Sequence, residues 1–278
     1  MAARSSTAPI VLLTDFGYRD HYAGVMRGVI SILAPDAHVI DLTHGIPAQS
    51  VVAGALALAQ SWRYFPSESI FVGVVDPGVG TARLPIAIET VAGARFVGPD
   101  NGLLSLAADA AGFARAVELR ESRYRLDAVS ATFHGRDVFS PAAAHLWRGV
   151  NLDALGPAVA SLTRLDFCSD ITETDDNLCG AIIYIDGFGN LISNLDRSRI
   201  TALQSRFRGR RLLVRINRGA PIPMLSAYGY AAAGAPLATF GSFNLLEVAV
   251  RDGNAADFFA ASSGTPVTIE VDSESSDG

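Results

Sequence analysis

The stretch from residue 71 to residue 85, FVGVVDPGVGTARLP, joins an apolar run to a compact turn. The run is typical of a buried strand, and Asp76 follows it at the start of the turn. Arg83 comes a few residues later and can return beside that carboxylate. Two interpretations stay open: a structural ion pair within a β-turn, or a carboxylate and a guanidinium placed for chemistry where a strand ends.

Two further apolar runs, residues 10–14 and 38–42, precede this stretch, and each is followed by a helical segment. Asp20 is expected to cap the first helix, and the second is expected at about residues 49–62. This alternation predicts an α/β domain with a mostly parallel central sheet, whose ligands bind where the strands end. Three side chains lie at or just beyond those ends: Asp15, His44 and Asp76.

Short β-type runs separated by glycine-rich turns, such as RLLVRI, PLATF and LLEVAV, dominate the last third of the chain. They predict a smaller antiparallel β domain after a polar linker. The expected division is a disordered N-terminus (1–8), an N-terminal α/β domain (9–165), a linker (166–179), a C-terminal β domain (180–271) and a disordered tail (272–278).

The composition excludes several classes of function. The net charge of −6 argues against binding of nucleic acid, which needs a concentrated basic surface. All 22 basic residues are arginine, which excludes Schiff-base lysine chemistry and the Gly-Lys-Ser/Thr phosphate loop. The N-terminal run IVLL is too short for a signal peptide or a membrane span. Two cysteines without metal-ligand spacing favour a reduced, cytoplasmic setting.

Three other motifs each allow a functional and a structural interpretation. Asp15, in TDFGYRDH, either hydrogen-bonds a ribose diol or only terminates a strand. The stretch DGFGNLISN, residues 186–194, is either a glycine-rich hairpin or a platform on which a base stacks on Phe188. His134 precedes a helix in TFHGRD, where a lone histidine is more often structural than catalytic.

Taken together, the motifs resemble the S-adenosyl-L-methionine hydroxide adenosyltransferases, relatives of the S-adenosyl-L-methionine-dependent fluorinase and chlorinase. The resemblance spans about residues 10–270 and rests on seven stretches in the family order: LTDFG, DLTHGIPAQ, VVDPGVGTAR, GPDNGLL, TFHGRDVF, IDGFGNLISN and LLEVAVRDGNAA. It implies an α/β domain followed by a smaller, β-barrel-like antiparallel domain. It also implies a homotrimer that binds substrate between the first domain of one subunit and the second domain of its neighbour.

The implied reaction is hydrolysis of S-adenosyl-L-methionine to adenosine and L-methionine by in-line attack of water or hydroxide on the 5′ carbon. No metal or cofactor is implied, and no nucleic acid or membrane partner. The implied catalytic residues are Asp76, Arg83 and His134. The implied substrate-binding residues are Asp15 for the ribose, Phe188, Asn190 and Tyr228 for the adenine pocket, Asp186 for the methionine ammonium and Ser242 for its carboxylate.

The chain departs from its halogenating relatives in ways that favour water over halide. They have tyrosines where this chain has Asp76 and His134, and hydroxyls of their halide pocket are replaced by Val79 and Gly135. It also departs from the usual hydroxide-using pattern near the methionine and adenine sites. Those departures are Ala235, Gly241 and Arg251.

The working hypothesis is that Asp76 orients the water, Arg83 fixes Asp76, and His134 takes or relays the proton. Whether Asp76 or His134 finally holds the proton stays open. Two alternatives compete. A metal-dependent nucleoside hydrolase has a similar aspartate cluster, but Leu13 and His21 stand where calcium-binding carboxylates are needed. A non-catalytic adenosyl-ligand binding protein would bind the substrate without releasing methionine.

Overall fold

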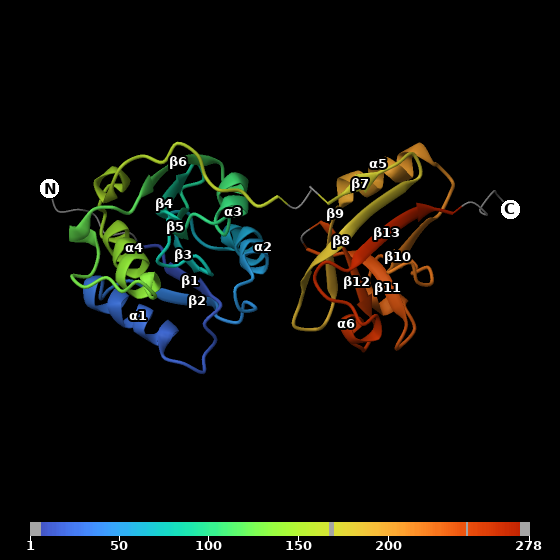
Figure 1. Ribbon diagram of the computed structural model, residues 1–278, viewed down its shortest axis with the longest axis horizontal. Helices are drawn as coiled ribbons and strands as arrows, with labels where there is room; N and C mark the ends of the chain where they lie inside the picture. Colours follow the sequence, from blue (N-terminus) through green and yellow to red (C-terminus); the bar gives the residue numbers. More distant parts are fainter. Residues whose placement is uncertain (1–6, 167–169, 243, 273–278) are drawn as a thin grey trace. The chain divides into compact units, whose positions relative to one another are not determined.

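The computed structural model describes residues 7–166, 170–242 and 244–272. The chain divides into two compact units, Met1–Leu165 and Asp166–Gly278 (Figure 1). Most of the predicted disordered termini lies outside the described residues. Two of their residues do not fit that prediction. Ala8 is buried and its carbonyl accepts a hydrogen bond from the Trp147 indole, and the Asp272 amide donates to the Arg211 carbonyl.

The first unit is built on a six-stranded sheet in the order β2-β1-β3-β5-β4-β6. Strands β2, β1, β3 and β5 pair in parallel, and only β4 is reversed, because it pairs antiparallel with both β5 and β6. The predicted mostly parallel sheet is confirmed. The quoted stretch supplies β3, and its turn leads directly into β4. The bounds are β1 Ile10–Thr14, β2 Val39–Thr43, β3 Ile70–Val74, β4 Pro85–Thr90, β5 Arg95–Pro99 and β6 Phe113–Glu118.

Helices cover this sheet in two packed groups, α1 with α4 and α2 with α3 (Figure 1). Their bounds are α1 Tyr22–Leu33, α2 Val51–Ser61, α3 Ser105–Ala110 and α4 Ser140–Trp147, with a π-helical turn at Gly135–Phe139. Helix α1 buries Met26 and Ile30 against the sheet and α4. The prediction that Asp20 caps α1 is wrong, because the N-cap is His21, which makes no side-chain cap, and Asp20 is exposed in the preceding turn.

The second unit is an antiparallel sheet in the order β10-β13-β8-β9-β12-β11, with β7 paired to β8. Isolated bridges join Ile222 to Val214 of β10 and Met224 to Ala238 of β11, so one segment links the two edge strands into the predicted barrel-like form. The bounds are β7 Thr172–Glu173, β8 Asn177–Ile185, β9 Leu191–Asp196, α5 Arg197–Arg206, β10 Leu212–Ile216, β11 Pro236–Phe240, β12 Leu245–Val250, α6 Ala255–Phe258 and β13 Pro266–Val271.

The polar segment 166–179, interpreted as a linker, contains β7 and the first residues of β8. Pairing of Thr172 with Cys179 and of Glu173 with Leu178 explains how so polar a segment adopts strand structure at the edge of the barrel-like sheet. No helix within the described part of the chain is long and apolar enough to cross a membrane.

Candidate active site

The turn after β3 folds back tightly on itself. The Val79 amide donates to the Asp76 carbonyl, and the amide and hydroxyl of Thr81 both donate to the Gly78 carbonyl. Gly80 has a φ of +76°, and a Cβ on it would lie 2.4 Å from the Ala131 carbonyl oxygen. The turn therefore needs glycine there both for its backbone conformation and for its close approach to the loop that leads to His134.

This geometry brings Arg83 back onto Asp76. Arg83 Nε donates to Asp76 Oδ1 at 2.8 Å and Arg83 Nη2 donates to Asp76 Oδ2, which makes a forked ion pair. The two side chains are 9% and 6% exposed, so the pair is nearly buried. The guanidinium also lies over the Phe139 ring, 5.3 Å from its centroid. The predicted pairing is thus formed, and the Phe139 ring packs against its guanidinium.

His134 is the third member of this cluster. Its Nδ1 lies 2.9 Å from Arg83 Nη2, and a guanidinium can only donate hydrogen bonds. Nδ1 must therefore accept, so the neutral ring carries its proton on Nε2. Burial, followed by the positive charge of Arg83, lowers the pKa of His134. Both effects keep the imidazole neutral at neutral pH. Arg83 Nη1 is buried without a partner among the described residues.

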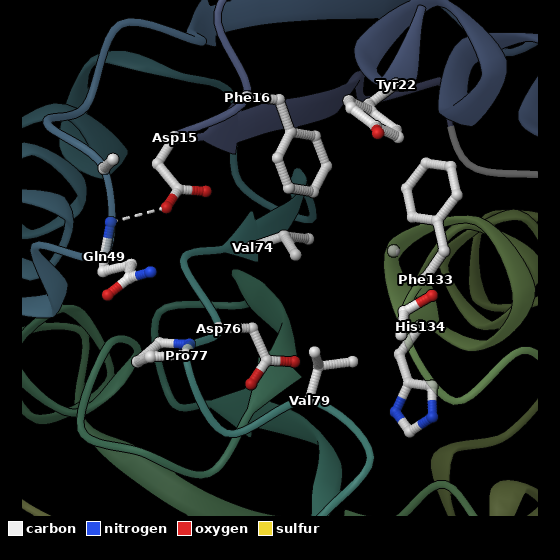
Figure 2. A pocket seen from close by; sticks show the side chains of 13 residues that line it. Asp15, Phe16, Tyr22, Gln49, Val74, Asp76, Pro77, Val79, Phe133 and His134 are labelled. Atoms are coloured by element: carbon white, nitrogen blue, oxygen red, sulfur yellow. Dashed lines mark hydrogen bonds between the residues drawn. The ribbon is translucent and has the colours of Figure 1, made fainter.

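A cavity of about 430 Å³ opens beside this cluster in the first unit (Figure 2). Asp76 and His134 line it, and so does Asp15 from the end of β1, whereas Arg83 lies behind Asp76. The Gln49 amide donates to Asp15 Oδ2 at 2.8 Å, which orients the carboxylate. The structure thus gathers the predicted ribose residue and the predicted catalytic residues at one cavity.

Aromatic side chains form a wall of this cavity that the sequence interpretation missed. The rings of Phe16, Tyr22 and Phe133 contact one another at 5.3 to 5.8 Å between centroids. In Figure 2, Phe16 lies beside Asp15, and Tyr22 and Phe133 lie on the opposite side of the view. Tyr22 lies at the start of α1 and is 40% exposed. Two of these aromatic residues could have been predicted from the sequence, because Phe16 directly follows Asp15 and Phe133 directly precedes His134. Val79 and Gly135, the two departures from the halogenating relatives, also line the cavity.

His44 does not line this cavity but holds the loop that carries Asp15. It is fully buried, and its Nδ1 lies 2.8 Å from Thr14 Oγ1, which itself accepts a hydrogen bond from the Phe16 amide. The Gly17 amide donates to the His44 carbonyl at 2.7 Å. His44 Nε2 faces Asp41 Oδ1 at 3.3 Å. His44 is therefore part of the framework that fixes the Asp15 loop.

A second cavity, of about 690 Å³, lies in the second unit. It is lined by all five substrate-binding residues predicted there: Asp186, Phe188, Asn190, Tyr228 and Ser242. Two of the departures from the family pattern, Gly241 and Arg251, also line it. The third, Ala235, packs instead against the small apolar cluster around Leu237 and Ala249. The fold of the second unit thus brings residues more than fifty positions apart in the sequence to one cavity.

Asp186 organises the hairpin at the edge of this cavity. Its Oδ1 accepts hydrogen bonds from the Phe188 and Asn190 amides, and its Oδ2 accepts one from Asn190 Nδ2, all at 2.9 Å. The Phe188 ring is left 82% exposed. Both interpretations of this stretch are therefore compatible with the structure: it is a glycine-rich hairpin, and it leaves an uncovered aromatic ring at the second cavity.

Glu247 also lines the second cavity and was missed by the sequence interpretation. It lies on β12, is 6% exposed, and accepts a hydrogen bond from the Tyr228 hydroxyl through Oε1. Burial and the nearby Asp186 charge raise the pKa of Glu247 despite the opposing effect of the Tyr228 hydrogen bond. Glu247 could have been noticed in the sequence, because it is the single carboxylate inside the apolar run LLEVAV.

Among residues 7–166, 170–242 and 244–272, no group of three or more His, Cys, Asp or Glu side chains could hold a metal ion. His21 stacks on Tyr22 and is not part of a carboxylate cluster.

Comparison with known proteins shows which family the chain belongs to. Models of the N-terminal and C-terminal domains of SAM hydroxide adenosyltransferases match residues 10–156 and 180–268. The (R)-S-adenosyl-L-methionine hydrolases of Thermus thermophilus and Salinispora arenicola are 38% and 40% identical, over 94% and 95% of this chain and 99% and 98% of their own. An uncharacterized conserved protein from Thermotoga maritima has a crystal structure that matches with a TM-score of 0.83 and 32% identity, covering 94% of this chain and 99% of that one. The chain therefore belongs to the SAM hydroxide adenosyltransferase family.

Proposed function

We propose that this protein hydrolyses S-adenosyl-L-methionine to adenosine and L-methionine. The water oxygen attacks the 5′ carbon in line, the bond from that carbon to sulfur breaks, and sulfur takes the electron pair as methionine leaves. The water gives up one proton. The observation that carries the proposal is the hydrogen-bonded Asp76–Arg83–His134 cluster, two of whose members line a cavity in a chain of this family.

The cluster fits the task of holding a water molecule. Asp76 accepts a hydrogen bond from the water, because its carboxylate lines the cavity while Arg83 fixes it from behind. Neutral His134 relays the proton, but its Nδ1 accepts a proton only after giving up the Arg83 hydrogen bond. Holding the nucleophile in line is worth up to about 7 to 11 kcal/mol, and proton removal about 10²- to 10⁴-fold in rate. Positioning is therefore the larger contribution.

The remaining predicted residues bind the substrate. Asp15 accepts from the ribose hydroxyls, Phe188 stacks on the adenine, and Ser242 meets the methionine carboxylate. Asn190 and Tyr228 complete the adenine pocket, and Asp186 contributes to the ammonium site. The chain acts as a homotrimer in which the first cavity of one subunit and the second cavity of its neighbour share one substrate. Support comes from the family membership and from the division of the predicted residues between two cavities.

The reaction proceeds without a metal or a cofactor, because the sulfonium is already an activated leaving group. Incubation with S-adenosyl-L-methionine in ¹⁸O water should place the label on the 5′ oxygen of adenosine, as mass spectrometry of the products would show. Dialysis against EDTA should leave the rate unchanged. Free adenine and loss of activity in EDTA would instead indicate a metal-dependent nucleoside hydrolase, and binding without release of methionine would indicate a sensor.

The lowered pKa of His134 predicts the acid limb of the pH profile. A depressed pKa means that the neutral, active imidazole persists as the pH falls, so kcat/KM should decline with a midpoint below the ordinary histidine value of about 6.5. His134→Gln, whose amide oxygen can still accept from Arg83, should lose this limb. A wild-type midpoint above 6.5, or the same limb in His134→Gln, would contradict the assignment.

A further inference from the structure

Arg125 is a half-buried arginine of the first unit that lacks a counterion. It follows the short 3₁₀ turn Ser122–Tyr124. Its Nη2 donates to the Leu119 carbonyl, and its Nε is buried without a hydrogen-bond partner among the described residues. No carboxylate in the described part of the chain forms an ion pair with it, and the Glu118 carboxylate, whose charge acts on Arg125, is paired with Arg120 at 2.6 Å. Burial of a cation is costly unless a carboxylate compensates it, so this charge needs an explanation.

The backbone joins the segment after Arg125 to the turn that begins at His134. The Leu126 amide donates to the Asp137 carbonyl at 2.9 Å, and the Ser130 amide donates to Asp137 Oδ2 at 2.8 Å. Arg125 is close enough to His134 for its charge to act on the imidazole. The arginine is thus fixed near the histidine of the catalytic cluster by the packing of two neighbouring segments.

The carboxylates whose charges act on the His134 imidazole each have a guanidinium of their own. The two forked pairs are Asp76 with Arg83 and Asp137 with Arg136. Two negative and two positive charges cancel, so Arg125 leaves this region with an excess positive charge. Burial first, then Arg83, and to a smaller extent Arg125 lower the pKa of His134. The excess charge therefore disfavours the imidazolium.

We propose that Arg125 is a positioning residue for the reaction, because its uncompensated charge keeps the His134 imidazole neutral and so preserves Nδ1 as the acceptor for Arg83. The inference rests on the proposed function, since it concerns the group that relays the proton of the water. Arg83 acts on His134 through a hydrogen bond, whereas Arg125 acts only through its charge. A neutral charge at position 125 would let the imidazole take up a proton from solvent, and a protonated ring can neither accept from Arg83 nor relay.

The test titrates the His134 ring by two-dimensional ¹H–¹⁵N NMR, with its signals assigned by their loss in His134→Gln. Arg125→Met should raise the pKa of His134 by about 0.3 to 1 pH unit, the effect of one charge at moderate distance and high effective dielectric constant. Arg125→Gln is also neutral but can still donate to the Leu119 carbonyl, and it should give the same rise. Arg125→Lys keeps the charge and should keep the wild-type value. The acid limb of kcat/KM should move upward by the same amount in the two neutral variants only.

Arg123→Met is the matched control, because it removes an exposed arginine of the same segment whose guanidinium lies over the Tyr124 ring. It should leave both the titration of His134 and the acid limb unchanged. A wild-type pKa of His134 in both neutral variants would overturn the inference. So would an equal rise in Arg125→Lys, because the effect would then come from a structural contact and not from charge. The titration needs no turnover, so absence of adenosine from the wild-type protein would refute the proposed function and leave this comparison intact.

Discussion

Asp76→Asn should reduce turnover about 10²- to 10⁴-fold while substrate binding remains measurable. Asparagine keeps the size of the side chain but replaces the charged carboxylate, which accepts a hydrogen bond from the water, with a neutral amide. It also presents an amide in place of one of the two oxygens that Arg83 holds. The expected signature is a fall in kcat with little change in KM, because Asp76 faces the attacking water and not the adenine or the methionine.

The same substitution should also destabilise the protein. Asp76 and Arg83 are 6% and 9% exposed, and loss of one partner of a buried pair costs about 3 to 5 kcal/mol. Urea unfolding measures this cost and verifies that the variant is folded during the assay. Asp109→Asn is the matched control, because Asp109 forms a forked pair with Arg164 at the surface, where pairs contribute about 0 to 1 kcal/mol. Near-normal turnover in Asp76→Asn would refute its catalytic role.

Phe188→Ala should raise KM about 5- to 150-fold with little change in kcat. Stacking of a base on an aromatic ring contributes about 1 to 3 kcal/mol, and this ring is 82% exposed and has no apolar packing to lose. The free energy of unfolding should therefore stay the same. Phe258→Ala removes another exposed aromatic side chain of the same unit, outside the second cavity, and should leave KM unchanged.

The two variants together test the shared site of the proposed trimer. Asp76→Asn damages the first cavity and Phe188→Ala the second, so mixed assemblies contain some sites in which both cavities are intact. At low substrate concentration, co-refolded mixtures should be more active than the sum of the separate variants. Strictly additive activity, or sedimentation as a monomer, would contradict the trimer.

Much of the fold follows from local pattern. Apolar runs predicted β1, β2 and β3 closely, because strands buried on one or both faces contain few polar residues. The sequence also predicted that a helix, α1, follows β1, but it did not predict where the first turn of that helix begins. The prediction that Asp20 caps α1 was wrong, because the helix begins at Tyr22, after the His21 N-cap and beside the first cavity.

The sequence by itself determined most of the strands and the order of the two domains. It also determined the pairing of Asp76 with Arg83, because one short turn between two strands brings these two side chains together. Only the tertiary structure decided that His134 meets Arg83 through Nδ1, and that Glu247 lies against Tyr228 and Gly241. Those contacts join segments far apart in the chain. Periodicity reports which face of a strand or helix is buried, whereas the packing of whole elements decides which buried polar atoms meet.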